Sequence, residues 1–160
     1  MSQPLNKVVL ILHNLRSAHN VGAIFRTAEA IGVKKIYLTG YTPAPLDKFK
    51  RVNKAIAKTA LGAEKIIAWE KIKNISVLLN KLKTTKHQLV ALEQAKNSVD
   101  YKTVTPQPPI AMVVGNEVTG LTTSILAKMD IVAEIAMIGR KESLNVAVAT
   151  GIALFRWLDK

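Results

Sequence analysis

Short apolar runs of strand length alternate with segments of helical periodicity along most of the chain. This alternation predicts repeated βα units, and hence an α/β fold with a mainly parallel sheet flanked by helices. The runs are continuously apolar, which is typical of strands that helices cover on both faces. The expected strands are Lys7–Leu12, Lys35–Thr39, Lys65–Trp69, Gln88–Leu92, Ile110–Val114 and Ile131–Ile135.

Three helices are expected where apolar residues recur every three or four positions. The first begins near Asn20, an N-cap type of residue, and ends before Gly32, which suits a C-terminal cap. The second spans 70 to about 83 and turns its lysines to solvent. The third spans 143 to about 158 and is apolar around most of its circumference. We therefore expect the third helix to be buried all round, at a subunit interface.

Length and composition fit a single folded domain. The chain has 160 residues, 49% of them hydrophobic and 21% charged. No apolar run reaches the roughly 18 residues that a membrane helix needs, and the first residues lack the features of a signal peptide. We therefore expect a cytoplasmic protein. The lack of cysteine and the spacing of the three histidines argue against disulfides, thiolate chemistry and a metal site.

The positive charge is concentrated in the first half of the chain. Residues 1–90 carry 16 basic and 4 acidic side chains, a net charge of +12, whereas residues 91–160 carry 7 of each. Such an excess predicts a polyanionic partner, although a lysine-rich surface that only keeps the protein soluble is the alternative. The longest irregular stretch, 40–54, is also the most basic, which makes it a candidate substrate-contacting loop.

Three polar segments stand out against the apolar background. Residues 14–26 leave the first strand and open the first helix, residues 113–121 follow a later strand, and residues 135–145 lead into the last helix. Open α/β sheets bind ligands at the carboxyl ends of their strands. The chain has neither a dinucleotide-binding glycine motif nor a P-loop. Each segment taken alone is better explained as a turn or a helix cap.

Taken together, in this order and spacing, the segments resemble the motifs of the SpoU or TrmH family of the SPOUT superfamily. Members of that family are RNA ribose 2′-O-methyltransferases that use S-adenosylmethionine. Residues 20–26 resemble the first motif, 115–121 the second and 143–145 the third. Many relatives have proline where this chain has His19 and Ala136, so we expect the loops at these two positions to differ locally from those of the relatives.

The resemblance implies an architecture that periodicity does not predict. Residues 1–160 would form one catalytic SPOUT domain, without a separate N-terminal RNA-binding domain. A deep trefoil knot would involve residues from about 110 to 148, an exception to the rule that connections avoid knots. The active form would be a homodimer with its sites beside the subunit interface. The apolar last helix is compatible with such an interface.

The resemblance also implies roles for individual residues. Arg26 is the first candidate at the reacting centre, as the base that takes the 2′-hydroxyl proton or as a cation that stabilises the developing alkoxide. The second role suits a guanidinium better, because its pKa lies above about 12. The companions expected to orient substrate and arginine are Asn20, Glu117, Ser143 and Asn145. The residues expected to contact S-adenosylmethionine are Leu92, Glu93, Gly115, Asn116, Glu117, Ile135, Met137, Ser143, Leu144 and Asn145. Those expected to contact RNA are Arg16, Lys48, Lys50, Arg51, Lys54 and Lys58.

Two other functions remain open at the level of sequence. A protein that keeps the knotted fold but binds RNA without catalysis would share these motifs, as would a related enzyme that methylates a base. The polar residues expected of an active site are all present, which favours ribose methylation of tRNA or rRNA.

Overall fold

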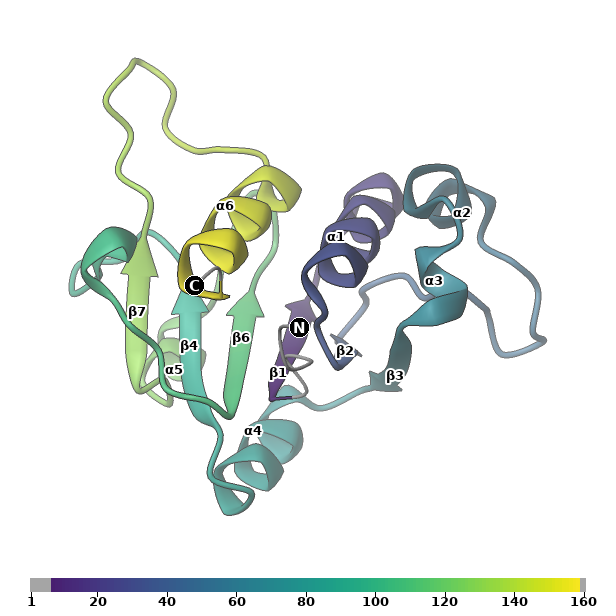
Figure 1. Cartoon of the computed structure of the whole chain (residues 1–160), viewed down its shortest axis with the longest axis horizontal. Coiled ribbons are helices and arrows are strands. Elements are labelled where there is room, and N and C mark those ends of the chain that lie inside the picture. The colour runs from purple at the N-terminus through teal and green to yellow at the C-terminus, as the bar shows by residue number, and fades with distance from the viewer. Residues whose placement is uncertain (1–6, 159–160) are drawn as a thin grey trace, which may run out of the picture.

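The computed structural model describes residues 7–158, which form one seven-stranded sheet (Figure 1). The strand order is β3-β2-β1-β6-β4-β7-β5, and every neighbouring pair is parallel. The strands are β1 Val8–His13, β2 Lys35–Thr39, β3 Ala68–Ile72, β4 Gln88–Leu92, β5 Val99–Asp100, β6 Ile110–Val114 and β7 Ile131–Glu134. The predicted parallel α/β sheet is therefore confirmed.

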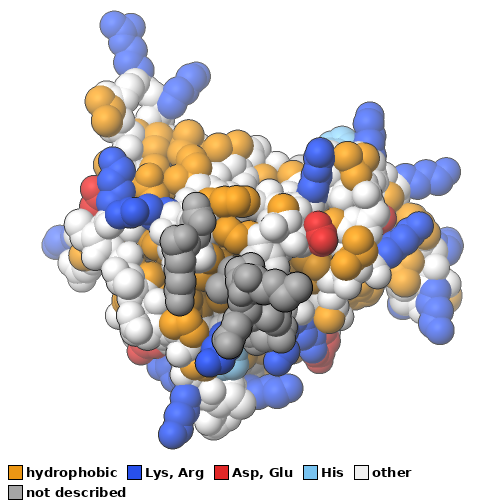
Figure 2. Space-filling view, in the orientation of Figure 1, with side chains coloured by type: hydrophobic (Ala, Val, Ile, Leu, Met, Phe, Trp, Pro, Cys, Tyr) orange, Lys and Arg blue, Asp and Glu red, His pale blue; other side chains and the backbone are white. Residues whose placement is uncertain are grey.

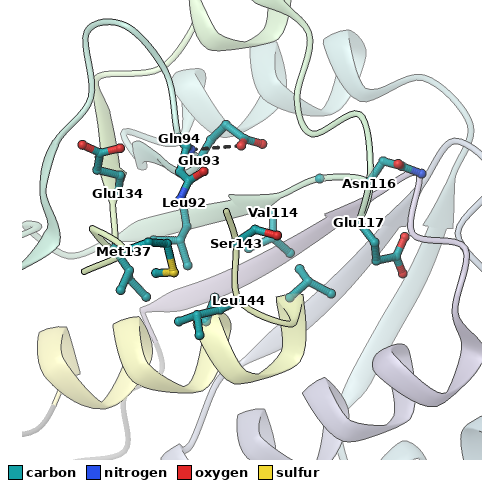
Figure 3. Close-up of a pocket in the computed structure, with 14 residues that line it drawn as sticks. Leu92, Glu93, Gln94, Val114, Asn116, Glu117, Glu134, Met137, Ser143 and Leu144 are labelled. Carbon is teal, nitrogen blue, oxygen red and sulfur yellow. Dashed lines mark hydrogen bonds between the residues drawn. The ribbon is translucent and has the colours of Figure 1, made fainter. Parts of the chain in front are cut away.

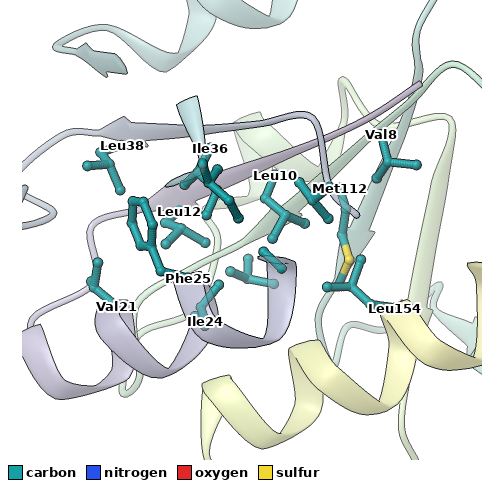
Figure 4. Close-up of a cluster of buried hydrophobic side chains, with 14 of the residues drawn as sticks. Val8, Leu10, Leu12, Val21, Ile24, Phe25, Ile36, Leu38, Met112 and Leu154 are labelled. Atoms are coloured by element: carbon teal, nitrogen blue, oxygen red, sulfur yellow. The ribbon is translucent and has the colours of Figure 1, made fainter. Parts of the chain in front are cut away.

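Helices cover both faces of the sheet. They are α1 Ala18–Ile31, α2 Lys54–Ala60, α3 Ala63–Ile66, α4 Ile75–Thr84, α5 Thr123–Leu126 and α6 Val146–Leu158, with a 3-10 turn at Tyr101–Thr103. Leu10 and Leu12 of β1 face α1 and α6, where Phe25 and Leu154 are buried (Figure 4). Ile11 faces the opposite layer, formed by α4 and α5. This alternation follows from the two-residue period of a strand.

Helix α1 begins earlier than the sequence predicted. Ser17 is its N-cap, and its hydroxyl accepts a hydrogen bond from the backbone N–H of Asn20 at 3.2 Å. Asn20 therefore lies in the first helical turn, where its side chain can bond to other segments. The predicted C-terminal cap is confirmed, since Gly32 adopts the left-handed conformation with φ 79°.

The prediction was wrong between the second and third strands. Residues expected to open a strand at 65–69 instead form the one-turn helix α3, and β3 begins at Ala68, opposite Lys35 of β2. The expected helix start at Glu70 lies within β3. Helix α4 begins later because the side chain of Asn74 accepts hydrogen bonds from the N–H groups of Ser76 and Val77.

The last helix begins at Val146 rather than at Ser143. Its first turn is capped by Asn145, whose Oδ1 accepts from the N–H of Ala147 at 2.9 Å. One apolar face remains uncovered, because Val148, Ile152 and Phe155 are 51%, 37% and 48% exposed. The expected burial all round is therefore not realised within one chain.

The basic stretch 40–54 is irregular as predicted, but it is not without structure. It contains an antiparallel bridge between Leu46 and Val52 and ends where α2 begins. Within residues 7–158, no helix has both the length and the apolar character required to cross a bilayer.

Candidate cofactor and RNA site

A hollow opens at the carboxyl ends of β4, β6 and β7, beside the start of α6 (Figure 3). Every residue predicted to contact the cofactor lines it, except Asn145. The lining residues are Leu92, Glu93, Gln94, Val114, Gly115, Asn116, Glu117, Glu134, Ile135, Met137, Ser143, Leu144, Val146 and Ala149. Three segments far apart in the sequence thus meet at one edge of the sheet, as parallel strands require.

The lining includes residues that the sequence analysis missed, among them Gln94 and Glu134. Glu134 is the last residue of β7, and Gln94 follows β4 by two positions. The available signal was their position at the carboxyl ends of predicted strands, with Gln94 just after one strand and Glu134 near the end of another. With Glu134 included, the hollow has three glutamates and no lysine or arginine in its lining. This is an acidic and partly apolar cavity in a chain of formal net charge +12.

Asn116 organises the turn that follows β6. It is buried, and its Oδ1 accepts from the N–H groups of Val118 and Thr119, each at 2.8 Å. Its Nδ2 donates to the backbone oxygen of Asn14 and to the Tyr41 hydroxyl, each at 2.9 Å. Because these four bonds reach segments after β1, β2 and β6, Asn116 ties three loops together.

The two glycines of this turn are required by close packing. A Cβ atom on Gly115 would lie 2.7 Å from Cδ2 of Leu121. Gly120 has φ 65°, and a Cβ there would lie 2.4 Å from Oε2 of Glu93. That same oxygen accepts from the N–H of Leu121 at 2.9 Å. Glu93 therefore holds the far end of the turn against the end of β4.

Glu117 connects the turn to the start of α1. Its carboxylate accepts from the N–H groups of Arg16 and Ser17, at 3.0 and 3.1 Å, and from Nδ2 of Asn20 at 3.3 Å. Partial burial opposes ionisation, but the backbone donors of Arg16 and Ser17 outweigh it and hold the pKa of Glu117 below its ordinary value. Glu117 is therefore ionised at neutral pH, with its oxygens already engaged.

The third motif joins the same network. Nδ2 of Asn145 donates to Oδ1 of Asn20 at 3.0 Å, and Asn20 in turn bonds to Glu117. Ser143 lines the hollow two residues before. One predicted site residue from each of the three motifs is thus linked in a continuous chain of hydrogen bonds.

Of the five residues predicted at the reacting centre, Arg26 alone joins neither this network nor the lining of the acidic hollow. It is exposed, lies nearly two turns after Asn20 and does not line the acidic hollow. It lines a separate hollow with Lys58, Leu61 and Phe155, between α1, α2 and α6. That hollow adjoins the uncovered apolar face of α6 at Phe155.

The predicted RNA contacts lie on exposed parts of the surface. Arg16 lines a hollow with Tyr41 and Asn116, next to the acidic one. The others, Lys48, Lys50, Arg51, Lys54 and Lys58, are all exposed. Figure 2 shows Lys and Arg side chains projecting around the end of the molecule where the loop after β2 lies in Figure 1.

The family model described as the SpoU rRNA methylase family matches residues 7–155. The chain belongs to the SpoU rRNA methylase family. Among curated SpoU relatives, a tRNA (guanosine(18)-2′-O)-methyltransferase of Aquifex aeolicus is 36% identical over 92% of this chain and 67% of its own length. A Staphylococcus saprophyticus protein, named for the TrmH family of tRNA/rRNA methyltransferases, is 31% identical over 95% of this chain and 58% of its own length. The chain thus spans about three fifths of the curated relatives' length.

Solved structures of RNA-modifying enzymes share the fold. The crystal structure of an A. aeolicus TrmH/SpoU tRNA-modifying enzyme matches with a TM-score of 0.83 and 32% identity, over 96% of this chain and 74% of that one. An AdoMet-bound rRNA methyltransferase of Sinorhizobium meliloti matches with a TM-score of 0.82 and 29% identity, over 98% of this chain and 60% of that one. The resemblance to the SpoU or TrmH family is therefore confirmed.

Proposed function

We propose that this protein transfers a methyl group from S-adenosylmethionine to a ribose 2′-hydroxyl of tRNA or rRNA. The observation that carries the proposal is the lining of the hollow, with three glutamates and no lysine or arginine in a strongly basic chain. Such a site favours a cationic cofactor over a nucleotide polyphosphate. Family membership supports the reaction class, and the S. meliloti relative was solved with AdoMet bound.

The residues of the hollow fit S-adenosylmethionine chemically. Leu92, Val114 and Leu144 offer apolar surface for an adenine ring, and Glu134 offers a carboxylate for the positive groups. The glycine at 115 lets a ligand approach the backbone closely. When bound, S-adenosylmethionine supplies an electrophilic methyl group on a sulfonium.

The hydrogen-bonded network supports orienting roles for its members. Glu117 is engaged by three N–H donors, so it holds the loop before α1 in place and does not serve as the proton acceptor. Asn20 and Asn145 connect that loop to α6 and would orient the incoming ribose. As the ribose oxygen takes the methyl group, the S–CH3 bond breaks, S-adenosylhomocysteine leaves and the 2′-hydroxyl proton passes to water. A cation is needed to stabilise the alkoxide that develops, and Arg26 is the predicted supplier.

We propose that Arg26 acts in the site of a second copy of the chain. Arg26 is absent from the acidic hollow of its own chain, and it shares a hollow with Phe155 beside an uncovered apolar face. A homodimer packed through Val148, Ile152 and Phe155 would cover that face. The same packing would bring Arg26 toward the partner's site.

Mixed dimers test this arrangement. We expect Arg26→Ala to abolish methyl transfer with little loss of S-adenosylmethionine affinity, and Leu144→Arg to block the hollow. Neither variant should be active alone. Equal mixing, after dissociation and reassembly, should restore about one quarter of wild-type activity, because half of the dimers are mixed and each has one complete site. If mixing restores nothing while mixed dimers form, Arg26 does not act across the interface.

Cofactor binding is tested by calorimetric titration of S-adenosylmethionine. Leu144→Arg places a cation in the acidic hollow and should weaken binding more than tenfold. Ile138→Arg is the matched control, because Ile138 lies in the same segment and is fully exposed. Equal affinities for both variants would show that the cofactor binds elsewhere.

We also propose the knot that the resemblance implies, over residues from about 110 to 148. The strand order supports it, because β4 lies between β6 and β7 although it precedes both in the chain. Similarity to the A. aeolicus SpoU structure over 96% of this chain supports it further.

A further inference from the structure

The basic loop after β2 carries an exposed aromatic ring at its tip. We define the tip as residues 47–51, which the bridge between Leu46 and Val52 closes at its base. The Phe49 side chain is 66% exposed. Lys48 Nζ and Arg51 Cζ lie 5.0 and 5.1 Å from the centroid of its ring. The tip therefore presents an aromatic surface between positive charges.

The tip is held in one conformation by Asp47. Its Oδ1 accepts from the N–H groups of Phe49 and Arg51, at 2.8 and 3.0 Å, and its Oδ2 accepts from Nε of Arg51 at 2.7 Å. The backbone of Asp47 also bonds to Lys50 and Arg51. The backbone N–H of Arg51 lowers the pKa of Asp47, and this effect outweighs the opposing effect of desolvation. The Asp47 carboxylate is therefore ionised at neutral pH. An ordered tip loses little entropy when it binds a ligand.

The fold does not use the Phe49 ring. Neither buried hydrophobic cluster among residues 7–158 includes it. Exposing such a ring to water is unfavourable, whereas a nucleobase could stack on it. Three basic side chains around one ionised carboxylate leave the tip positive, which suits the phosphates on either side of that base. Aromatic rings bordered by cations are a common means of binding single-stranded RNA.

The tip and the proposed methylation site lie on the same edge of the sheet, at some distance from each other. The loop leaves the carboxyl end of β2, the same edge of the sheet at which the acidic hollow opens. Figure 1 shows the tip at the opposite end of that edge from α6 and β7. Between them lies the hollow of Arg16 and Tyr41, which shares Asn116 with the acidic one. An RNA strand along this edge could reach both sites at once.

We propose that Phe49 stacks on an unpaired nucleobase of the substrate RNA, at a distance from the methylated nucleotide. Lys48, Lys50 and Arg51 then bind the neighbouring phosphates, with one of the ring-bound cations moving from the ring to a phosphate. This inference rests on the proposed function for its RNA partner. It names the substrate class as RNA with an accessible unpaired nucleotide, rather than a continuous duplex, whose bases are already stacked.

Fluorescence anisotropy on the full chain tests the proposal. The probes are a fluorescein-labelled twelve-nucleotide oligoadenylate and a blunt RNA duplex of equal length. Phe49→Ala should weaken oligoadenylate binding about 5- to 150-fold, the usual range for loss of one stacked base, and leave duplex binding within about twofold. Phe49→Trp should retain affinity, whereas Phe49→Leu should behave like Phe49→Ala, because leucine keeps apolar bulk without an aromatic face.

The salt dependence separates stacking from charge. Phe49→Ala should lower affinity without changing the slope of log affinity against log salt. Lys50→Gln is the matched control and should reduce that slope by about 0.7, the contribution of one phosphate contact on a single strand. Thermal unfolding of each variant checks that the fold is kept.

Three outcomes would overturn the proposal. Phe49→Ala could bind oligoadenylate as the wild type does, or it could weaken duplex and single strand equally. It could also change the sedimentation coefficient while leaving RNA affinity unchanged, which would place Phe49 in a protein contact. The inference is separable from the proposed function. If Phe49→Ala transfers methyl groups and binds RNA normally, the stacking proposal is wrong and the proposed function stands. If the wild type binds RNA through Phe49 but transfers no methyl group, the proposed reaction is wrong and the stacking stands.

Discussion

Replacing Glu117 by glutamine tests whether the carboxylate holds the second motif to the start of α1. The substitution keeps the shape of the side chain but removes its charge. A glutamine oxygen in the place of Oε1 can still accept from Ser17, from Asn20 and, at 3.2 Å, from the N–H of Arg16. The new amide group would take the place of Oε2, which accepts the shorter bond from the N–H of Arg16 at 3.0 Å. The variant thus loses the shorter of the two bonds from Arg16 and weakens the three bonds that remain.

The expected cost follows from the strength of these bonds. Hydrogen bonds to a charged group contribute about 1.5–3 kcal/mol each, against about 1 kcal/mol for neutral ones. Because Glu117 is only partly buried, solvent screening reduces the difference. We expect Glu117→Gln to lower the free energy of unfolding by about 1–2 kcal/mol at pH 7. For a chain of this size the midpoint of thermal unfolding should then fall by about 2–8 °C.

The pH dependence gives the sharper test. The pKa of Glu117 is lower in the folded protein than its ordinary value of 4.5, so its stabilising contribution is complete above that value. It is lost as the pH falls through the folded pKa. The stability difference between wild type and Glu117→Gln should therefore be largest at pH 7 and shrink as the pH falls below 4.5.

Urea unfolding at fixed protein concentration, repeated from pH 7 to pH 3.5, measures this difference. Glu142→Gln serves as the control, because Glu142 is exposed and lies outside the network. Equal stability of Glu117→Gln and wild type at pH 7 would refute the anchoring role. A difference that stays constant down to pH 3.5 would refute the electrostatic part of the reasoning.

Substitutions at Gly115, Asn145 and Ile152 test other parts of the protein. Gly115→Ala should lower the free energy of unfolding, measured by calorimetry, by about 1–3 kcal/mol, because its Cβ would lie 2.7 Å from a carbon of Leu121. Gly139→Ala is the control and should change the free energy of unfolding little, because there is open space around Gly139. Asn145→Ala should cost about 1 kcal/mol through loss of the α6 cap, whereas Asn145→Asp should keep the cap and lose methyl transfer, because it cannot donate to Asn20. Ile152→Lys should shift the protein to monomers in sedimentation experiments, and an unchanged sedimentation coefficient would exclude α6 from the interface.

The sequence predicted those parts of the fold that depend on continuous burial. The strands at 35–39, 88–92 and 110–114 were placed with their correct bounds, because nearly every position in them is apolar and buried. The prediction for the segment 63–72 was wrong because a short apolar run fits either a strand or a helical turn. Its assignment depended on pairing with β2, which the sequence does not record.

The predicted starts of α1 and α6 were wrong for a different reason. Two capping residues compete at each site, Ser17 with Asn20 and Ser143 with Asn145, and either could serve by type. Tertiary hydrogen bonds decide which residue becomes the cap. The side chain of Asn20 donates to Glu117, 97 residues away in the sequence, and is not the cap. The placement of Arg26 could not be predicted from periodicity, because periodicity does not record how α1 packs beside α2 and α6, where Arg26 lies.

The most direct test of the proposed reaction is to identify the atom that receives the methyl group. The purified protein is incubated with methyl-labelled S-adenosylmethionine and, separately, with unmodified tRNA and rRNA, and the product is hydrolysed in alkali. A 2′-O-methyl group protects its own phosphate, because the hydroxyl that would attack it is blocked. We predict label in an alkali-resistant dinucleotide from one RNA class, and none with Arg26→Ala. Label in mononucleotides would show base methylation and contradict the proposed function.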